Sequence, residues 1–371
     1  MGESNLKNYK FHTITYRQYI FLIFGVQIGV GILQLPRILA EKSGMDGWIS
    51  LIFGYGVSVI ASLIIIQIMS KCPDGTLLDI LNKYLGKLGG KVGALLIFIY
   101  FMFLSFVVIQ RSLLFIRLWI IPGTAEYILM FLISIPIYVI ASKGFRIIGR
   151  YAELIFFLTI GLLFFYVVAL AESSHWYHLL PLFKDIKTPL INTLSTIMSF
   201  LGFEITFFLY PFLQKKKLAS RGILIANSLT LLFLLFITLS CFLFFSPDEI
   251  TQYNEPTLSM LKVVEFRFLE RVEIIFLALF LFVMSTTWIP YVYCASFCIG
   301  WLRNEQHYNR YVCSILILFL ILIYFIPPTF YQNDVLQNIS SNLGLVYVYI
   351  FPLYLWIYVT IYDRIRRRRI E

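Results

Sequence analysis

The sequence predicts an all-α membrane protein with about ten transmembrane helices, arranged as a five-plus-five inverted repeat in which helices 1 and 6 are discontinuous. Composition is the first support. Of 371 residues, 60% are hydrophobic and 13% are charged, and the mean hydropathy is +0.83. Soluble domains contain roughly 45–50% apolar and about 25% charged residues. The composition therefore excludes a water-soluble fold, and we expect residues 1–371 to form a single transmembrane domain.

Apolar windows give the second support, because a helix needs about 20 apolar residues to cross a bilayer. No cleavage site follows the first window, so it is expected to remain as a span. Pro327 and Pro328 should end or kink the ninth helix. The ten windows cover residues 15–38, 47–70, 92–117, 122–141, 149–171, 190–213, 222–245, 271–300, 311–331 and 343–363.

The positions of the basic residues support the same count. With a cytoplasmic N-terminus, 21 of the 30 Lys and Arg residues fall in the segments on the inner side, and the other nine fall on the outer side. Cytoplasmic loops carry such an excess. We therefore expect a multi-pass protein of the cell membrane with both termini cytoplasmic, and the net charge of +10 requires no nucleic acid partner. At the outer end of the third window, Arg111 and Arg117 either snorkel to the lipid headgroups, which we expect, or point into an extracellular vestibule.

Helix-breaking residues in two windows give the third support. The first window reads QIGVGILQLP over residues 27–36, and the sixth reads SFLGFE over residues 199–204. Glycine is a poor helix former, and an internal proline leaves a backbone carbonyl without its partner. Both interruptions fall in the first helix of a five-helix half, as in transporters built from inverted repeats. We expect the two repeats to cover residues 14–171 and 190–363.

Interrupted membrane helices predict a binding site, because unwound backbone is tolerated only in a cavity or inside protein. Free amide groups near Gly31 and Ile32 would face a carboxylate, and carbonyls near Gln27, Ile28 and Leu201 would face an ammonium group. An amino acid would satisfy both. The alternative is that the glycines only allow close helix packing.

The eighth window offers a further polar face. Met284, Thr287 and Tyr291 lie on one side of a helix by their spacing, and this face could complete a pocket. Alternatively, the hydroxyl of Thr287 bonds a carbonyl of its own helix.

Glu204 is the carboxylate that we place well inside the bilayer. An ionisable residue at that depth is a functional candidate by default. Gating and proton coupling are two interpretations. Capping of the second half-helix, where the helix dipole favours negative charge, is the third.

Motifs for catalysis are not found in the sequence. It contains no Walker A, G-x-S-x-G, H-E-x-x-H or CxxC motif. Glu172, His175 and His178 make only a weak metal pattern, because no further ligand is obvious. We therefore predict no enzyme activity, no catalytic residue, no metal site and no cofactor.

Six motifs occur in a characteristic order. They are ITYRQY at 14–19, GVGILQLPR at 29–37, CPDGTL at 72–77, GRYAE at 149–153, GFE at 202–204 and FLERVE at 268–273. Through them the chain resembles the spore germination permeases, which are the B subunits of germinant receptors within the amino acid/polyamine/organocation transporter superfamily.

The resemblance implies a germinant-sensing subunit in the spore inner membrane that recognises a small nutrient such as an amino acid, sugar or nucleoside. It also implies a hetero-oligomer with a membrane A subunit and a lipoprotein C subunit, and a substrate pocket on spans 1, 6 and 8. A proton- or cation-coupled amino acid permease is the alternative function. With Glu204 as the gating or coupling residue, the predicted substrate-binding residues are Gly25, Gln27, Ile28, Gly29, Gly31, Ile32, Leu201, Gly202, Phe203, Thr287 and Tyr291.

Overall fold

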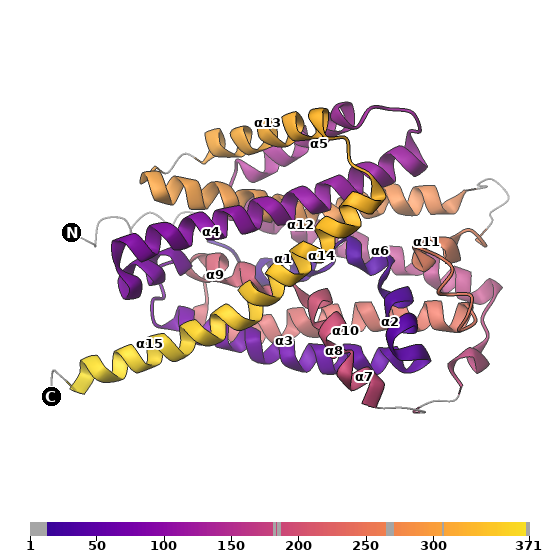
Figure 1. Ribbon diagram of the computed structural model, residues 1–371, viewed down its shortest axis with the longest axis horizontal. Helices are drawn as coiled ribbons and strands as arrows, with labels where there is room; N and C mark the ends of the chain where they lie inside the picture. The colour runs from indigo at the N-terminus through magenta and orange to yellow at the C-terminus, as the bar shows by residue number, and fades with distance from the viewer. Residues whose placement is uncertain (1–12, 181–182, 184–186, 265–270, 306–307, 369–371) are drawn as a thin grey trace.

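The structure is a computed structural model that describes residues 13–180, 183, 187–264, 271–305 and 308–368. Lys7, Lys10, Arg369 and the first three residues of the motif at 268–273 lie outside the described residues. Within the described part, the regular structure is helical, apart from one isolated backbone bridge between Ile14 and Leu213. Most of the long helices run along the long axis of the molecule (Figure 1).

The first half of the chain begins with a capped helix. Thr15 and Gln18 form a capping box, which satisfies two backbone amides at the start of α1. Later, Gly86 adopts φ 77° and interrupts α4 ahead of the predicted span at 92–117. The helices of this half are α1 (Tyr16–Gln27), η2 (Val30–Leu33), α2 (Leu35–Ser43), η3 (Gly44–Asp46), α3 (Gly47–Ser70), α4 (Leu77–Phe115), η4 (Ile116–Ile120), α5 (Glu126–Ala141) and α6 (Phe145–Glu172).

The second half begins with short pieces and continues with long helices. The pieces are η5 (Trp176–Leu179), α7 (Lys187–Ile191), α8 (Thr193–Ile197), η6 (Met198–Phe200), η7 (Phe203–Ile205), α9 (Thr206–Leu209), η8 (Tyr210–Phe212) and η9 (Lys216–Leu218). The remaining helices are α10 (Ala219–Phe244), α11 (Pro256–Leu261), α12 (Val272–Arg303), α13 (Asn309–Phe325), α14 (Phe330–Leu345), η10 (Val346–Ile350) and α15 (Phe351–Arg368).

The described helices match the predicted windows. Six helical segments are long and apolar enough to cross a membrane, and a pair bent by 44°, Thr193–Phe200 with Phe203–Phe212, makes a seventh. The other three windows contain α1 with α2, α5, and α13. The predicted helical membrane protein with discontinuous helices 1 and 6 is confirmed, whereas the boundaries of the repeats at 14–171 and 190–363 stay a prediction.

The tenth span begins earlier than predicted. The window was placed at 343–363, but the helix starts at Phe330 and continues through η10 into α15. The reason for the error is that α14 reads FYQNDVLQNISSNLGL, whose polar residues lower its hydropathy. The end of the ninth helix is as expected, because α13 finishes at Phe325, just before Pro327 and Pro328.

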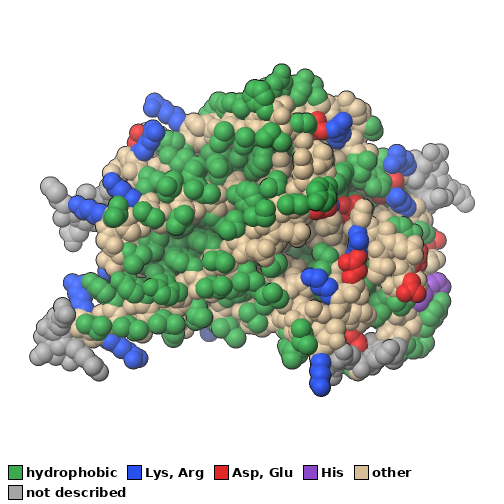
Figure 2. Space-filling model, viewed as in Figure 1, with side chains coloured by type: hydrophobic (Ala, Val, Ile, Leu, Met, Phe, Trp, Pro, Cys, Tyr) green, Lys and Arg blue, Asp and Glu red, His purple; other side chains and the backbone are tan. Residues whose placement is uncertain are grey.

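Helices α1 and α12 lie in the core. Every α12 residue from Val283 to Cys298 is buried, and α12 packs against α1, α4 and α6. In contrast, α5 and α13 leave large apolar side chains exposed. Figure 2 shows apolar side chains over most of the long face and charged side chains toward its two ends. This arrangement is typical of a lipid-facing surface.

Contacts at one end of the molecule join the N-terminal and C-terminal segments. Lys216 pairs with Asp74 at 2.6 Å, and Lys71 pairs with Asp363 of α15 at 3.2 Å. The bridge between Ile14 and Leu213 places the start of α1 close to Lys216. With an even number of spans, the first and last segments of the chain must lie on the same side of the membrane. The assignment of this end to the cytoplasm stays a prediction.

Candidate functional site

The two helix interruptions lie against each other. Helix α1 ends at Gln27, and the amide of Ile28 donates to the Phe24 carbonyl at 3.1 Å before the chain turns. In the sixth span, Gly202 adopts φ 130°, between η6 and η7. A Cβ atom at Gly202 would lie 2.9 Å from the backbone nitrogen of Gln27. The backbones of the two breaks are therefore in direct contact.

A cavity of about 570 Å³ opens beside the breaks. Ligand pockets measure about 300–1,000 Å³, so this cavity has room for a small organic molecule. Seven of the predicted substrate-binding residues line it: Gln27, Gly29, Gly31, Ile32, Leu201, Thr287 and Tyr291. The other four, Gly25, Ile28, Gly202 and Phe203, are not part of the lining that the structure describes.

Packing accounts for two of the predicted glycines. A Cβ atom at Gly25 would lie 2.8 Å from Oγ1 of Thr286 on α12, and Gly202 meets the backbone of α1. Gly31 differs from both, because no atom lies within 4 Å of its Cβ position. The packing interpretation therefore applies to Gly25 and Gly202, whereas Gly31 faces the cavity.

The side chain of Gln27 connects the two breaks. Its Nε2 donates to the carbonyl of Phe200 at 2.9 Å and to Oδ1 of Asn227 at 2.8 Å. Its Oε1 accepts from Oγ1 of Thr230 at 2.6 Å. The amide is thus fully occupied by α10 and by the break in the sixth span, although Gln27 lines the cavity.

Hydroxyl groups of α12 bind the carbonyl end of α1. Thr286 Oγ1 donates to the Gly25 carbonyl at 2.9 Å. Thr287 Oγ1 lies 3.4 Å from the Gly25 carbonyl and 3.3 Å from the Val26 carbonyl, which places its hydrogen bonds on α1 and not on its own helix. These carbonyls at the end of the first half-helix therefore already accept hydrogen bonds from protein.

Glu204 is fully buried beside the cavity. Its Oε1 accepts hydrogen bonds from the hydroxyls of Tyr291 at 2.9 Å and Tyr100 at 3.3 Å. Its Oε2 accepts from the backbone amide of Gly202 at 2.6 Å. No Lys or Arg among the described residues forms an ion pair with it. Since Tyr291 also lines the cavity, one hydrogen bond separates Glu204 from it.

Arg111 corrects one expectation from the sequence. Snorkelling was expected, but the residue is only 2% exposed and pairs with Glu255 at 2.9 Å and with Asp334 at 2.7 Å. Burial raises the pKa of Glu255, and the neighbouring Arg111 guanidinium opposes that rise. The two carboxylates come from the segment before α11 and from α14, so the partners are distant in sequence. Arg117 pairs with Glu126 and stays half-exposed.

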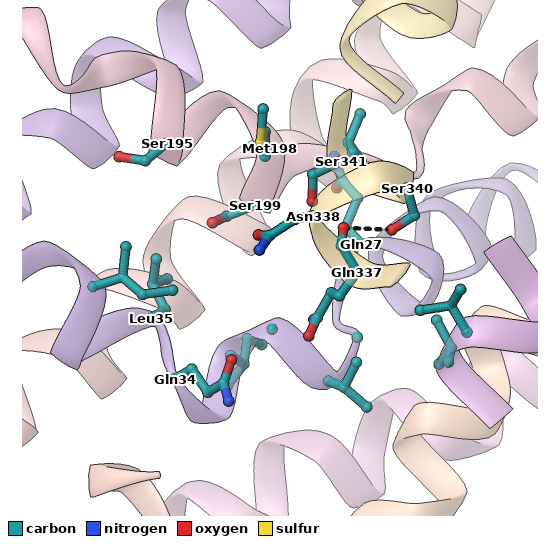
Figure 3. Close-up of a pocket in the computed structure, with 18 of the residues that line it drawn as sticks. Gln27, Gln34, Leu35, Ser195, Met198, Ser199, Gln337, Asn338, Ser340 and Ser341 are labelled. Carbon is teal, nitrogen blue, oxygen red and sulfur yellow. Dashed lines mark hydrogen bonds between the residues drawn. The ribbon is translucent and has the colours of Figure 1, made fainter. Parts of the chain in front are cut away.

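One face of α14 lines the cavity and was missed in the sequence. Asp334, Gln337, Asn338 and Ser341 lie on it and follow the i, i+3, i+4, i+7 spacing of a helical stripe. The same spacing can be seen in the sequence once the tenth helix is taken to begin at Phe330 instead of residue 343. Figure 3 shows residues of this face opposite Ser195, Ser199 and Gln34, which also line the cavity.

Comparisons with known proteins agree with this fold. The spore germination protein GerQB of Bacillus cereus is 29% identical over 367 residues, covering 94% of this chain and 96% of that protein. Spore germination protein YndE of Bacillus subtilis is 27% identical over 290 residues, covering 76% and 79%. These names describe germination proteins and not an enzyme class.

Two solved transporters share the fold. A Na⁺-coupled sialic acid symporter, in a substrate-bound outward-open state, matches with a TM-score of 0.67 at 11% identity, over 90% of this chain and 77% of that one. MhsT in complex with L-phenylalanine matches with a TM-score of 0.64 at 13% identity, over 90% and 87%. At these identities the likeness shows the fold alone. The family model for spore germination proteins matches residues 13–333, most of the sequence, and the chain therefore belongs to that family.

Proposed function

We propose that this chain is the nutrient-sensing membrane subunit of a spore germination receptor, and that it binds a small molecule such as an amino acid where helices 1 and 6 are unwound. The observation that carries the proposal is the cavity of about 570 Å³, which is lined by backbone from both breaks. Half-helix ends at mid-membrane are the places where transporters of inverted-repeat architecture hold their substrates. The proposed contacts are the seven predicted residues that line the cavity.

The proposal includes location and partners. The names of the relatives, all spore germination proteins, support placement in the spore inner membrane with both termini cytoplasmic. A membrane A subunit and a lipoprotein C subunit are the proposed partners. Ligand binding would alter the packing of α1 against α12 and the sixth span, and these helices would pass the change to the partner subunits.

A proton- or cation-coupled amino acid permease is the second candidate, and Glu204 is the observation that favours it. The carboxyl group is buried, has no cation partner in the described part of the chain, and lies one hydrogen bond from the cavity through Tyr291. A buried ionised carboxylate is costly without a counter-charge. Uptake of a proton at Glu204 would therefore change the hydrogen bonds at the cavity wall.

Reconstitution of the purified chain in liposomes separates these functions. Thermal unfolding with amino acids, sugars and nucleosides measures binding, and a ligand at 100 times its Kd should stabilise the protein by about 2.7 kcal/mol. The receptor function predicts binding without flux, whereas the permease function predicts binding with uptake. Absence of binding for the whole panel would contradict both functions.

A matched pair of glycine variants locates the site. Gly31→Val fills space in the cavity and should weaken binding. Gly56→Val is the control, because Gly56 lies on α3, has no atom within 4 Å of its Cβ position and does not line the cavity. Equal binding by the two variants would place the ligand elsewhere.

A further inference from the structure

Basic side chains gather at the end of the molecule where α15 finishes. On the face drawn in Figure 2, Lys and Arg dominate that end, on the left, whereas acidic and basic side chains are mixed at the opposite end. Two helices present exposed basic residues there. We call this set the basic rim, and its members are Lys83, Lys87 and Lys91 of α4 with Arg364 and Arg366 of α15.

Helix packing brings the two halves of the basic rim together. The hydroxyl of Tyr84 on α4 donates to Oδ1 of Asp363 on α15 at 3.0 Å, between residues 279 positions apart. The rings of Tyr84 and Tyr362 lie 5.3 Å apart. Lys83 and Arg364 are the sequence neighbours of the two bonded residues. The basic residues of α4 and α15 therefore belong to one surface.

Nearby acidic residues do not neutralise the basic rim. Asp74 and Asp363 are each paired with a lysine outside it, and Asp79 accepts a hydrogen bond from Nε1 of Trp301 at 2.9 Å. Among the residues that the structure describes, no Asp or Glu forms an ion pair with a member of the rim. Its positive charges are therefore available to an anionic partner.

Apolar side chains lie between the basic ones. Leu88 is 78% exposed and Ile365 is 52% exposed. The rim also lies just beyond the ends of two apolar windows, 92–117 and 343–363. At a membrane surface, leucine and isoleucine can enter the acyl region while lysine and arginine reach the headgroups. An acidic protein segment would satisfy the charges alone, so a lipid is the better match.

One stripe of α4 offers a path for the acyl chains. Leu88, Val92, Leu95 and Ile99 are exposed, and their i, i+4, i+7, i+11 spacing places them on one side of the helix. The stripe begins next to Lys87 and runs into the predicted span. A phospholipid with its phosphate at the basic rim could lay a chain along it.

We propose that the basic rim binds an anionic phospholipid, with Lys83 and Arg364 as the main contacts of its phosphate and the exposed stripe of α4 as the path of its acyl chain. Such a lipid joins α4 to the tenth helix, which runs from α14 through η10 into α15. Both α4 and α14 line the cavity, so the lipid would brace two of its walls. The proposal does not depend on which molecule the cavity holds.

Native mass spectrometry of the purified full-length chain in detergent tests the proposal. The probes are phosphatidylglycerol and phosphatidylcholine with identical acyl chains, and the titrations give a Kd for each. Phosphatidylcholine carries an ammonium group that the rim repels. We therefore expect phosphatidylglycerol to bind about tenfold or more tightly than phosphatidylcholine, since each basic residue near an anionic surface contributes about fivefold in affinity.

Charge-removing variants locate the site. Lys83→Gln and Arg364→Gln should each raise the Kd for phosphatidylglycerol about fivefold and leave the Kd for phosphatidylcholine unchanged. The double variant should lose less than the product of the two single effects, because both side chains contact one phosphate. The matched control is Arg146→Gln with Arg150→Gln, which removes two exposed basic residues of α6 outside the rim. It should change the Kd less than twofold.

Three results would overturn the proposal. Equal Kd values for the two lipids would show that the rim does not select an anionic headgroup. Equal losses in the rim variants and in the α6 control would show only a general effect of positive charge. Displacement of phosphatidylglycerol by poly-L-glutamate that binds more tightly would assign the rim to an acidic protein segment.

Discussion

Both interrupted helices contain glycine at the break, but the glycines are surrounded differently. In helix 1, the Cβ position of Gly31 has no atom within 4 Å. In helix 6, Gly202 at φ 130° is wedged against the backbone of Gln27, 2.9 Å from its Cβ position. Gly31 leaves open space at the cavity, and Gly202 allows two backbones to meet. The role of a glycine in a broken membrane helix therefore depends on the atoms that pack around it.

The polar side chains of the two breaks differ in the same way. Both polar atoms of the Gln27 amide form hydrogen bonds within the protein, Nε2 to the Phe200 carbonyl and Asn227 and Oε1 to Thr230, so this side chain holds the breaks together. Glu204 accepts from Tyr291, which also lines the cavity. The side chain of Gln27 therefore stabilises the fold, whereas the side chain of Glu204 is linked to the cavity through Tyr291.

Gly202→Val should give the largest effect. The left-handed φ strains any residue with a Cβ atom, and the added atoms overlap the Gln27 backbone. Strain and overpacking each cost about 1–3 kcal/mol, so we expect a loss of about 2–6 kcal/mol in the free energy of unfolding and poor accumulation. Denaturant unfolding in detergent measures the loss. Stability equal to that of Gly31→Val would remove the distinction between the two breaks.

Gln27→Leu should give the next largest effect. It removes the donor to the Phe200 carbonyl and to Oδ1 of Asn227, whereas the Thr230 hydroxyl keeps its bond to the Ala226 carbonyl. Each unsatisfied buried group costs about 1–3 kcal/mol. We expect a loss of about 3 kcal/mol, measured by the same unfolding experiment. Addition of Asn227→Leu should recover part of the loss, because it removes one orphaned amide. A stable single variant would show that the network does not hold the breaks together.

Glu204→Gln should affect response more than stability. The new Oε1 can accept from Tyr291, but the new Nε2 cannot accept from the Gly202 amide. Loss of that cap costs about 0.5–2 kcal/mol. If Glu204 couples or gates, the pH dependence of the nutrient response should change strongly in spores carrying the variant, after correction for subunit level. An unchanged pH curve would leave Glu204 as a helix cap.

Gly31→Ala should change stability least. The Cβ atom enters open space, so the free energy of unfolding should stay within about 1 kcal/mol of the original. Ligand affinity should fall, since the methyl group occupies part of the cavity beside the first break. Isothermal titration measures the affinity, and Gly56→Ala is the control. A large loss of stability would mean that Gly31 has a packing role like that of Gly202.

Much of the fold could be predicted from the sequence, because hydropathy and helix breaking are local properties. The apolar windows correspond to the helices, and the breaks fall at the predicted residues. The start of the tenth helix could not be found this way. Asp334, Gln337 and Asn338 make α14 too polar for an apolar window, and only a cavity on the same side makes such residues acceptable within a membrane helix.

The candidate site was predicted less completely than the fold. Seven of the eleven substrate-binding residues line the cavity, because they sit at the breaks themselves. The roles of Gly25 and Gly202 depend on what packs against them, and the polar face of α14 depends on where that helix begins. Arg111 was assigned to the headgroups because its partners, Glu255 and Asp334, are remote in the sequence.

The sequence by itself determined that this protein lies in a membrane, where most of its helices fall and which two of them break, since each depends on a short stretch of chain. Only the tertiary structure decided which polar groups are already satisfied and which face the cavity. The reason is distance along the chain: Gln27 meets Asn227 across 200 residues, and Arg111 meets Asp334 across 223. Such pairs form when helices pack, and no local pattern specifies them.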